Sequence, residues 1–336
     1  MSLLINSIAH FLVDALCVTT LFSGGLEGAA LSEMAVLYNT LAFSTQCLTG
    51  LLADRLRGYL RLDVAAMLLT VLGFFLPLPF AARIAVVGLG NSLFHVAAGT
   101  MTLTESGGKA WQLGVFVAPG AFGVTLGTSY PVFGAYLAAA LLVCAGALCL
   151  ARRGRGDALP AARREGKLPL APVLLLTAAV AVRAVGGAAV SFPWKNTVLL
   201  GFVMTAFVFA GKAAGGFVCD RFGPEKTALL SVPLAALCIA FFSGSMPLSL
   251  LGQLLLNLTM PVTLWLLYQA MPDAPGFAFG LAASALWPGT IVGQLFRLTG
   301  PALWLCVALS FCFGLFAILF SCKKLRLAKT ERKNAS

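Results

Sequence analysis

The chain of 336 residues is 60% hydrophobic and only 10% charged, and it carries a formal net charge of +11. Soluble domains carry roughly 25% charged residues, so this chain has too little polar surface to face water on all sides. The composition therefore excludes an ordinary soluble domain and indicates a protein of the lipid bilayer.

Apolar runs of about 20 residues recur along the chain, each long enough to cross a hydrocarbon core of about 30 Å. Backbone polar groups in lipid need internal partners, which leaves helices or a closed barrel, and runs without period-two alternation exclude the barrel. The sequence predicts twelve transmembrane helices: Leu3–Phe22, Ser32–Ala53, Leu62–Leu78, Ile84–Leu103, Trp111–Ser129, Pro131–Ala151, Leu168–Val190, Thr197–Cys219, Thr227–Phe242, Leu248–Ala270, Gly276–Leu298 and Pro301–Cys322.

The basic residues set the expected orientation. If the N-terminus is cytoplasmic, most of the 23 Lys and Arg residues lie at cytoplasmic helix ends, which is the positive-inside bias. The surplus of positive charge then reflects topology, and no nucleic-acid partner is expected. We expect a multi-pass protein of the plasma or inner membrane with both termini cytoplasmic. The first segment has no basic leader or cleavage site, so we expect it to be retained.

No metal or organic cofactor is expected. The nine cysteines form no CxxC pair, and no Cys/His cluster has metal-ligand spacing in the sequence. We interpret them as small buried hydrophobic residues. The sequence also lacks a nucleotide-binding loop and any nucleophile–base pair typical of an enzyme.

The most polar internal segment divides the chain into two halves. The predicted units are an N-terminal six-helix bundle (1–151), a basic cytoplasmic linker (152–167), a C-terminal six-helix bundle (168–322) and a basic cytoplasmic tail (323–336). Three pairs of landmarks recur at nearly constant offset: Asp54 and Asp220, Asn91 and Asn257, and the dipeptides Pro119-Gly120 and Pro288-Gly289. This pattern indicates a parallel six-plus-six repeat.

At these landmarks the sequence resembles a known family. Gly50-Leu-Leu-Ala-Asp54-Arg55 resembles the signature that follows the second helix of major facilitator superfamily transporters, and Gly216-Phe-Val-Cys-Asp220-Arg221-Phe-Gly223 resembles its second copy. The first copy departs from the pattern because Arg57 stands where a glycine is expected. Three strings, HFLVDALC, GLGNSLFHVAAG and AGKAAGGFVCDRFG, are most similar to the fosmidomycin-resistance type of efflux proteins.

The resemblance implies that the first, fourth, seventh and tenth helices line a central cavity. Polar side chains inside the predicted spans concentrate on those helices, and charged groups within a membrane usually face a cavity or a partner. The candidate cavity residues are Asn6, Asn91, His95, Arg183, Lys212, Gln253 and Asn257.

Asp14 is the candidate proton site, and His10, one helical turn away, is the candidate relay. A carboxyl group in a cavity of low dielectric constant can load and release a proton near neutral pH. The alternative is that Asp14 forms a fixed pair that holds helices together, and that both His10 and His95 are structural.

Arg183 stands 169 residues after Asp14, at nearly the repeat-related position. Its guanidinium could bind a phosphate or carboxylate group of a substrate in a fork, or it could form a structural ion pair. The same two interpretations are open for Lys212. Together with Asp14, these charges favour anionic or zwitterionic cargo.

The family resemblance assigns the gate to Gly50, Asp54, Arg55, Gly216, Asp220, Arg221 and Gly223. An aspartate at a helix end can cap a neighbouring helix N-terminus and pair with an arginine. Pro119-Gly120 and Pro288-Gly289 are expected to kink their helices.

These features predict an all-α membrane transporter, not an enzyme, that works as a monomer. Its partners would be the bilayer, protons and a small, possibly anionic organic compound or drug, and a proton gradient would drive efflux by alternating access. One alternative is a proton-coupled importer of an organic anion. Another is a membrane sensor or scaffold that transports nothing.

Overall fold

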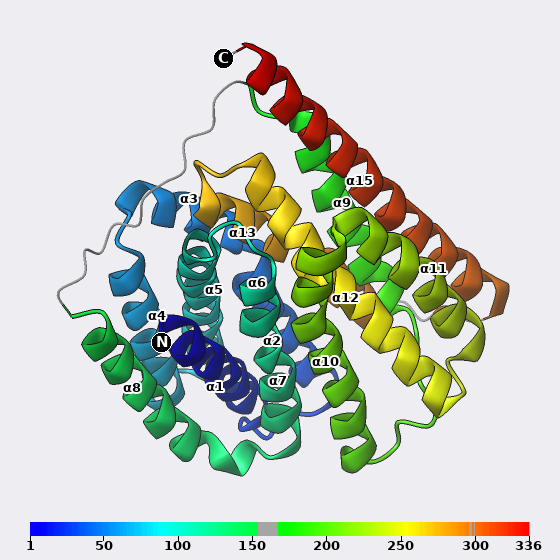
Figure 1. The fold of residues 1–336 in the computed structure, drawn as a ribbon. Helices are drawn as coiled ribbons and strands as arrows, with labels where there is room; N and C mark the ends of the chain where they lie inside the picture. Colours follow the sequence, from blue (N-terminus) through cyan, green and yellow to red (C-terminus); the bar gives the residue numbers. More distant parts are fainter. Residues whose placement is uncertain (154–166, 296–297, 299, 336) are drawn as a thin grey trace.

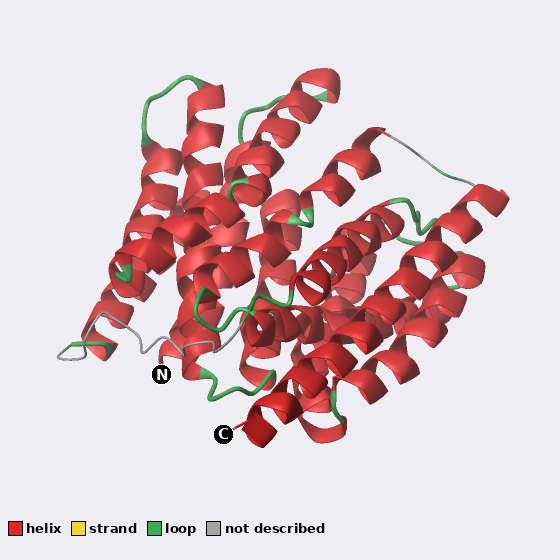
Figure 2. Ribbon diagram, turned by 90° about the horizontal axis from the view of Figure 1, so that it is seen from above, coloured by secondary structure: helices red, strands yellow, loops and turns green. Residues whose placement is uncertain are grey.

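The computed structural model describes residues 1–153, 167–295, 298 and 300–335, and within them it contains helices and no strands (Figure 2). The elements are α1 (Ser2–Phe22), α2 (Gly28–Asn39), a π-helical turn η1 (Thr40–Ser44), α3 (Gln46–Leu56), α4 (Tyr59–Phe75), α5 (Phe80–Glu105), α6 (Trp111–Val117), α7 (Pro119–Ser129), a short 3₁₀ turn η2 (Pro131–Phe133), α8 (Gly134–Ala151), α9 (Leu170–Ala188), α10 (Val198–Phe222), α11 (Pro224–Phe242), α12 (Met246–Ala270), α13 (Pro275–Ser284), α14 (Trp287–Leu295) and α15 (Gly300–Ala335).

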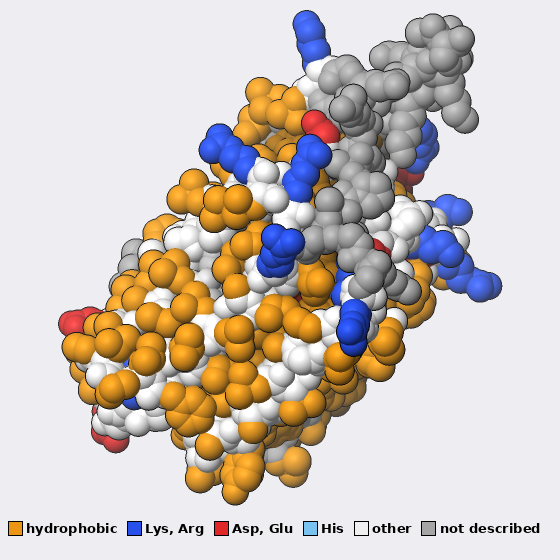
Figure 3. All heavy atoms as spheres, turned by 90° about the vertical axis from the view of Figure 1, so that its left-hand side faces the viewer, with side chains coloured by type: hydrophobic (Ala, Val, Ile, Leu, Met, Phe, Trp, Pro, Cys, Tyr) orange, Lys and Arg blue, Asp and Glu red, His pale blue; other side chains and the backbone are white. Residues whose placement is uncertain are grey.

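The expectation of a multi-pass, all-helical membrane protein is confirmed. In the described part of the chain, nine helical segments are long and apolar enough to cross a membrane. Large apolar side chains such as Leu150, Leu199 and Leu230 are more than 70% exposed, as is expected for a surface that faces lipid. Figure 3 shows hydrophobic side chains over much of one face, with Lys and Arg gathered toward one end.

The remaining three predicted spans are helical but interrupted or short, so the number twelve stays a prediction. Ser32–Ala53 is divided among α2, η1 and α3, and Trp111–Ser129 is divided between α6 and α7. The third segment, α4, has only 17 residues. Breaks of this kind are common where helices border functional cavities.

The first half of the chain, up to α8, and the second half, from α9 onward, form the two sides of the molecule (Figure 1). Helices α4 and α8 lie at the outer edge of one side and α11 and α15 at the outer edge of the other. The two sides meet where α3 packs on α13 and where α6 and α7 pack on α10. The proposed linker lies outside the described residues except for Arg152, Arg153 and Lys167, and the proposed tail continues α15 to Ala335.

Candidate functional site

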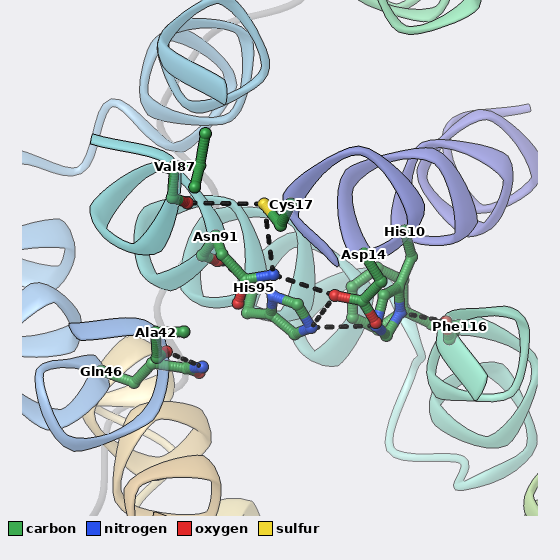
Figure 4. Close-up of polar contacts among 9 residues, drawn as sticks. All are labelled: His10, Asp14, Cys17, Ala42, Gln46, Val87, Asn91, His95 and Phe116. Carbon is green, nitrogen blue, oxygen red and sulfur yellow. Dashed lines mark hydrogen bonds and ion pairs between the residues drawn. The ribbon is translucent and has the colours of Figure 1, made fainter. Parts of the chain in front are cut away.

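A cluster of four polar side chains lies between α1 and α5 (Figure 4). Helix α1 contributes His10 and Asp14, which are one turn apart, and their Nε2 and Oδ2 atoms are 3.3 Å apart. Helix α5 contributes Asn91 and His95, also one turn apart. Asn91 Nδ2 donates a 2.9 Å hydrogen bond to Asp14 Oδ1, and His95 Nε2 lies 3.7 Å from that oxygen. We call these four residues the histidine–aspartate cluster.

Backbone carbonyls fix both histidine rings. His10 Nδ1 lies 2.7 Å from the carbonyl oxygen of Phe116, and His95 Nδ1 lies 2.9 Å from that of Asn91. The two Nε2 atoms then meet at 2.9 Å, with the rings nearly perpendicular at 84°. The side chains of His10 and Asp14 are only 6% and 13% exposed, so their hydrogen bonds form in a largely water-free setting.

The interruption between α6 and α7 explains how the Phe116 carbonyl becomes available to His10. The amide hydrogen that Pro119 lacks would have bonded the Val115 carbonyl, so regular helix hydrogen bonding breaks here and α6 ends at Val117. Phe116 then lies in the last turn of α6, where carbonyls have no partner within the helix. Beyond the break, Gly120 and Gly123 face α1 closely. A Cβ atom built on Gly120 would lie 2.4 Å from both Asp14 Oδ2 and His10 Nε2. Only glycine at this position permits α7 to approach the cluster so closely.

The cluster opens onto a cavity of about 340 Å³ between the two sides of the molecule. His10, Asp14 and His95 line the wall formed by α1 and α5, and Arg183 and Lys212 line the opposite wall, formed by α9 and α10. Most of the remaining lining is apolar, contributed for example by Val180, Phe279 and Leu286. Acidic and basic groups from the two halves therefore face one shared space.

In the described part of the chain, the cations that line this cavity are Arg183 and Lys212. Arg183 Nη1 donates a 2.9 Å hydrogen bond to Thr259 Oγ1. Among the described residues, neither cation has a carboxylate within ion-pair distance. Both also line a second compartment of about 420 Å³, which contains Gln253 and Asn257. The two cations thus stand where the two compartments meet, and they retain capacity to bind an anion.

Two predicted cavity residues lie elsewhere. Asn6 is buried beside a separate small cavity of about 20 Å³ that Glu105 and Gln112 also line. It lies one turn of α1 before His10, which lines the central cavity. Asn91 lines neither large cavity, because it is only 1% exposed, and its side chain donates a hydrogen bond to Asp14. In this structure, therefore, neither side chain lines the central cavity, in contrast to the expectation from the sequence.

Asp54 binds the beginning of α13. Its two carboxylate oxygens accept 2.8 Å hydrogen bonds from the amides of Gly276 and Phe277. The residue that precedes α13, Ala274, has no side chain able to cap the helix, so the carboxylate of the opposite half takes this role. Gly50 and Gly276 allow the contact, because a Cβ built on Gly50 would lie 2.4 Å from the carbonyl oxygen of Gly276.

Asp220 makes the equivalent contact with α6. Its oxygens accept hydrogen bonds from the amides of Ala110, at 2.8 Å, and Trp111, at 3.0 Å. Gly216 lies next to this contact, since a Cβ there would be 2.4 Å from the Ala110 carbonyl oxygen. We refer to the Asp54 and Asp220 contacts as the two helix clamps. A further hydrogen bond between the halves, from Trp265 Nε1 to the Gly108 carbonyl at 2.7 Å, accompanies them.

The arginines of the two signatures do not join the clamps. Arg55 and Arg221 are exposed, and Arg221 lies over the Phe222 ring. Arg57, at the expected glycine position, adopts a left-handed conformation with φ of 52° and ends α3. Gly223 ends α10 with φ of 87°. The turn therefore keeps its positive φ angle even where the glycine is missing.

Pro288 and Gly289 follow the end of α13 and stand at the start of α14. Near this break, Ser284 and Trp287, which no sequence pattern singled out, form hydrogen bonds with the opposite half. Ser284 Oγ donates to the Phe43 and Ser44 carbonyls of η1, and Trp287 Nε1 donates to Thr40 Oγ1 at 3.0 Å. A short π-helical turn is not visible in residue periodicity, so these bonds could not be predicted from the sequence.

The donor atoms of His10, Asp14 and His95 all lie within 4.8 Å of one another, a spacing that could admit a metal ion. However, the 2.9 Å between the two Nε2 atoms is a hydrogen-bond distance. Two nitrogen ligands of a tetrahedral zinc ion would stand about 3.3 Å apart. We therefore describe the cluster as a hydrogen-bonded group.

No protein-family model and no curated protein matches the sequence. The structure is similar to that of FucP, a major facilitator superfamily transporter, in its outward conformation, with a TM-score of 0.69, 14% identity, and coverage of 94% of this chain and 97% of that one. It is similar to a variant of the E. coli fucose:proton symporter FucP with the same TM-score, 15% identity, and coverage of 95% and 98%. The chain therefore has the fold of the major facilitator superfamily transporters.

Proposed function

We propose that the protein is a proton-coupled secondary transporter that moves a small organic anion across the membrane by alternating access. One observation carries the proposal: Asp14 with its two histidines on one half and Arg183 with Lys212 on the other line the same cavity. A proton-accepting group and an anion-binding group that share one space can exchange their ligands across it. The fold of FucP, described as a fucose:proton symporter, supports coupling to protons.

The two compartments fit a compound of drug size. Their volumes, about 340 and 420 Å³, fall within the roughly 300–1,000 Å³ of ordinary ligand pockets. The anionic group of the cargo would bind between Arg183 and Lys212. Its apolar part would pack against the apolar lining of the cavity that contains His10 and Asp14, and its polar part would face Gln253 and Asn257 in the second compartment.

The helix clamps would act as the gate. Each clamp ties one half to the other, and both lie at helix ends predicted to be cytoplasmic. In the opposite state of the cycle these bonds must break so that the cavity opens to that side. Capping bonds are worth roughly 1 kcal/mol each, which is weak enough to break and reform in every cycle.

We propose efflux in exchange for protons, in line with the similarity of three strings to fosmidomycin-resistance proteins. The test is a susceptibility panel, including fosmidomycin and other organic anions, in a bacterial strain without its own pumps. Expression of the chain should raise resistance to at least one anion, and Asp14→Asn should abolish the gain. Equal resistance with and without the chain would exclude export of the compounds tested.

Import together with a proton is the second candidate, favoured by the symporter description of FucP. Flux in right-side-out and everted vesicles separates the two directions. A sensor or scaffold would need no charged cavity, so Asp14→Ala and Arg183→Ala would leave its function intact. Loss of transport in both variants would exclude that class.

A further inference from the structure

The two histidines form three contacts that two neutral rings cannot satisfy. The Phe116 and Asn91 carbonyls only accept hydrogen bonds, so both Nδ1 atoms must carry a hydrogen. A neutral imidazole carries one hydrogen on its two nitrogens, so both Nε2 atoms would then present lone pairs. Those lone pairs would face each other at 2.9 Å. One additional proton between the two Nε2 atoms turns this repulsion into a hydrogen bond.

We propose that the coupling proton is held between His10 Nε2 and His95 Nε2, with Asp14 as its counter-ion. This inference rests on the proposed proton-coupled function and refines it, because His95 becomes a proton-binding residue and Asp14 a charge partner. When the proton leaves for the cavity, the N–H–N bridge breaks and both rings become neutral. Proton binding reverses that step.

The position of Asp14 fits a counter-ion. Asn91 Nδ2 donates to Oδ1, which favours the ionised carboxylate. Asp14 lies 3.3 Å from one Nε2 and 3.7 Å from the other, whereas the two nitrogens are 2.9 Å apart. The shortest path for a shared proton is therefore between the rings. A proton placed on Asp14 instead would leave the two lone pairs unbridged.

Other ionisable groups around the pair come from four further positions. Cys17 on α1 is buried near Asp14, and its thiol donates to the Val87 carbonyl at 3.4 Å, while Tyr38 on α2 lines the cavity. Lys212 on α10 and Arg183 on α9 face the pair across the cavity.

The pair is also connected to one helix clamp. His10 binds the Phe116 carbonyl near the end of α6, and Asp220 binds the amides of Ala110 and Trp111 at its beginning. Helix α6 has only seven residues, and the two contacts lie at its opposite ends. A change in the orientation of the His10 ring on proton loss would therefore act on a short, stiff segment whose other end is held by the opposite half.

The sequence has only two histidines, so the test needs no mutation. The full chain, purified with a histidine-free tag and labelled with ¹⁵N-histidine, is placed in lipid nanodiscs and studied by NMR across a pH series without cargo. We expect both Nδ1 atoms to stay protonated and both Nε2 signals to change together with the loss of one proton. A scalar coupling between the two Nε2 nuclei on the acidic side would report the shared proton directly.

His95→Gln should leave the remaining ring to titrate alone, with a midpoint shifted from that of the pair, and Gln is the matched neutral hydrogen-bonding replacement. The inference is overturned if either ring carries its neutral hydrogen on Nε2, if the rings titrate separately, or if EDTA alters the spectrum, since a metal ion would then be the bridge. The spectra are independent of flux. Absence of transport with an intact bridge would therefore refute the proposed function and not the proton position.

Discussion

Asp54 and Asp220 stand 166 residues apart in the sequence, and each caps a helix that belongs to the opposite half of the molecule. Both capped helices are preceded by an alanine, which has no side-chain acceptor of its own. Under the proposed function, the gate therefore depends on these two related carboxylates.

Asp54→Asn should loosen the clamp on α13. An asparagine offers one acceptor oxygen in place of two and turns an amide group towards the helix N-terminus. The loss of about 1 kcal/mol predicts roughly fivefold faster hydrogen exchange at the amides of Gly276 and Phe277. Hydrogen-exchange mass spectrometry measures this rate. Glu33→Gln, an exposed acid on α2, is the matched control and should leave exchange at α13 unchanged.

Arg57→Gly should stabilise the protein. Arg57 holds a φ of 52°, and a left-handed conformation costs a residue with a side chain roughly 1–2 kcal/mol relative to glycine. We expect a higher thermal unfolding temperature in detergent. Arg55→Gly, placed in the last turn of α3, should lower that temperature, because glycine costs about 1 kcal/mol inside a helix. Equal effects from both variants would contradict the assigned turn geometry.

Arg183→Gln should weaken the binding of anionic cargo. A hydrogen bond to a charged group contributes roughly 1.5–3 kcal/mol, so affinity for the anion selected in the susceptibility panel should fall about 30-fold. Competition binding to the purified protein checks this value. Lys195→Gln removes an equal charge at an exposed position outside the cavity and should change affinity little. Similar losses in both variants would point to a general charge effect instead.

His95 and Asp220 should be energetically coupled through α6. A double-mutant cycle of His95→Gln and Asp220→Asn, measured as amide exchange at Ala110 and Trp111, should give an interaction energy above roughly 0.5 kcal/mol. The same cycle with Asp54→Asn in place of Asp220→Asn should be additive, because Asp54 clamps a different helix. Additivity in both cycles would show that α6 does not transmit the state of the histidine pair.

The sequence was sufficient to predict an all-helical membrane protein, because apolar runs and the placement of basic residues follow directly from bilayer physics. It also singled out Asp14, Arg183 and Lys212, which line one cavity. It could not separate Asn6 from these residues, because helical periodicity does not tell where along α1 the cavity ends. The partners of His10 and His95 were invisible for another reason: both are backbone carbonyls, which every residue carries.

Sequence patterns likewise gave the clamp aspartates but not their targets. A repeated Asp-Arg motif at a helix end indicates a contact, yet the capped helix is set by how the halves pack. Arg55 and Arg221 take no part in the clamps, because both carboxylates already accept hydrogen bonds from the amides at the beginnings of α6 and α13.

The proposed transport cycle exchanges a proton bound at the histidine–aspartate cluster for an anion bound at Arg183 in one shared cavity. Everted membrane vesicles test this exchange, with an acidic lumen and a pH-sensitive dye to follow protons as the selected anion is added. We expect proton release from the lumen that requires both Asp14 and Arg183. The variant Asp63→Asn, which changes a buried acid outside both large cavities, should retain this release. Anion transport without any proton movement, or full coupling in Asp14→Asn, would contradict the proposed exchange.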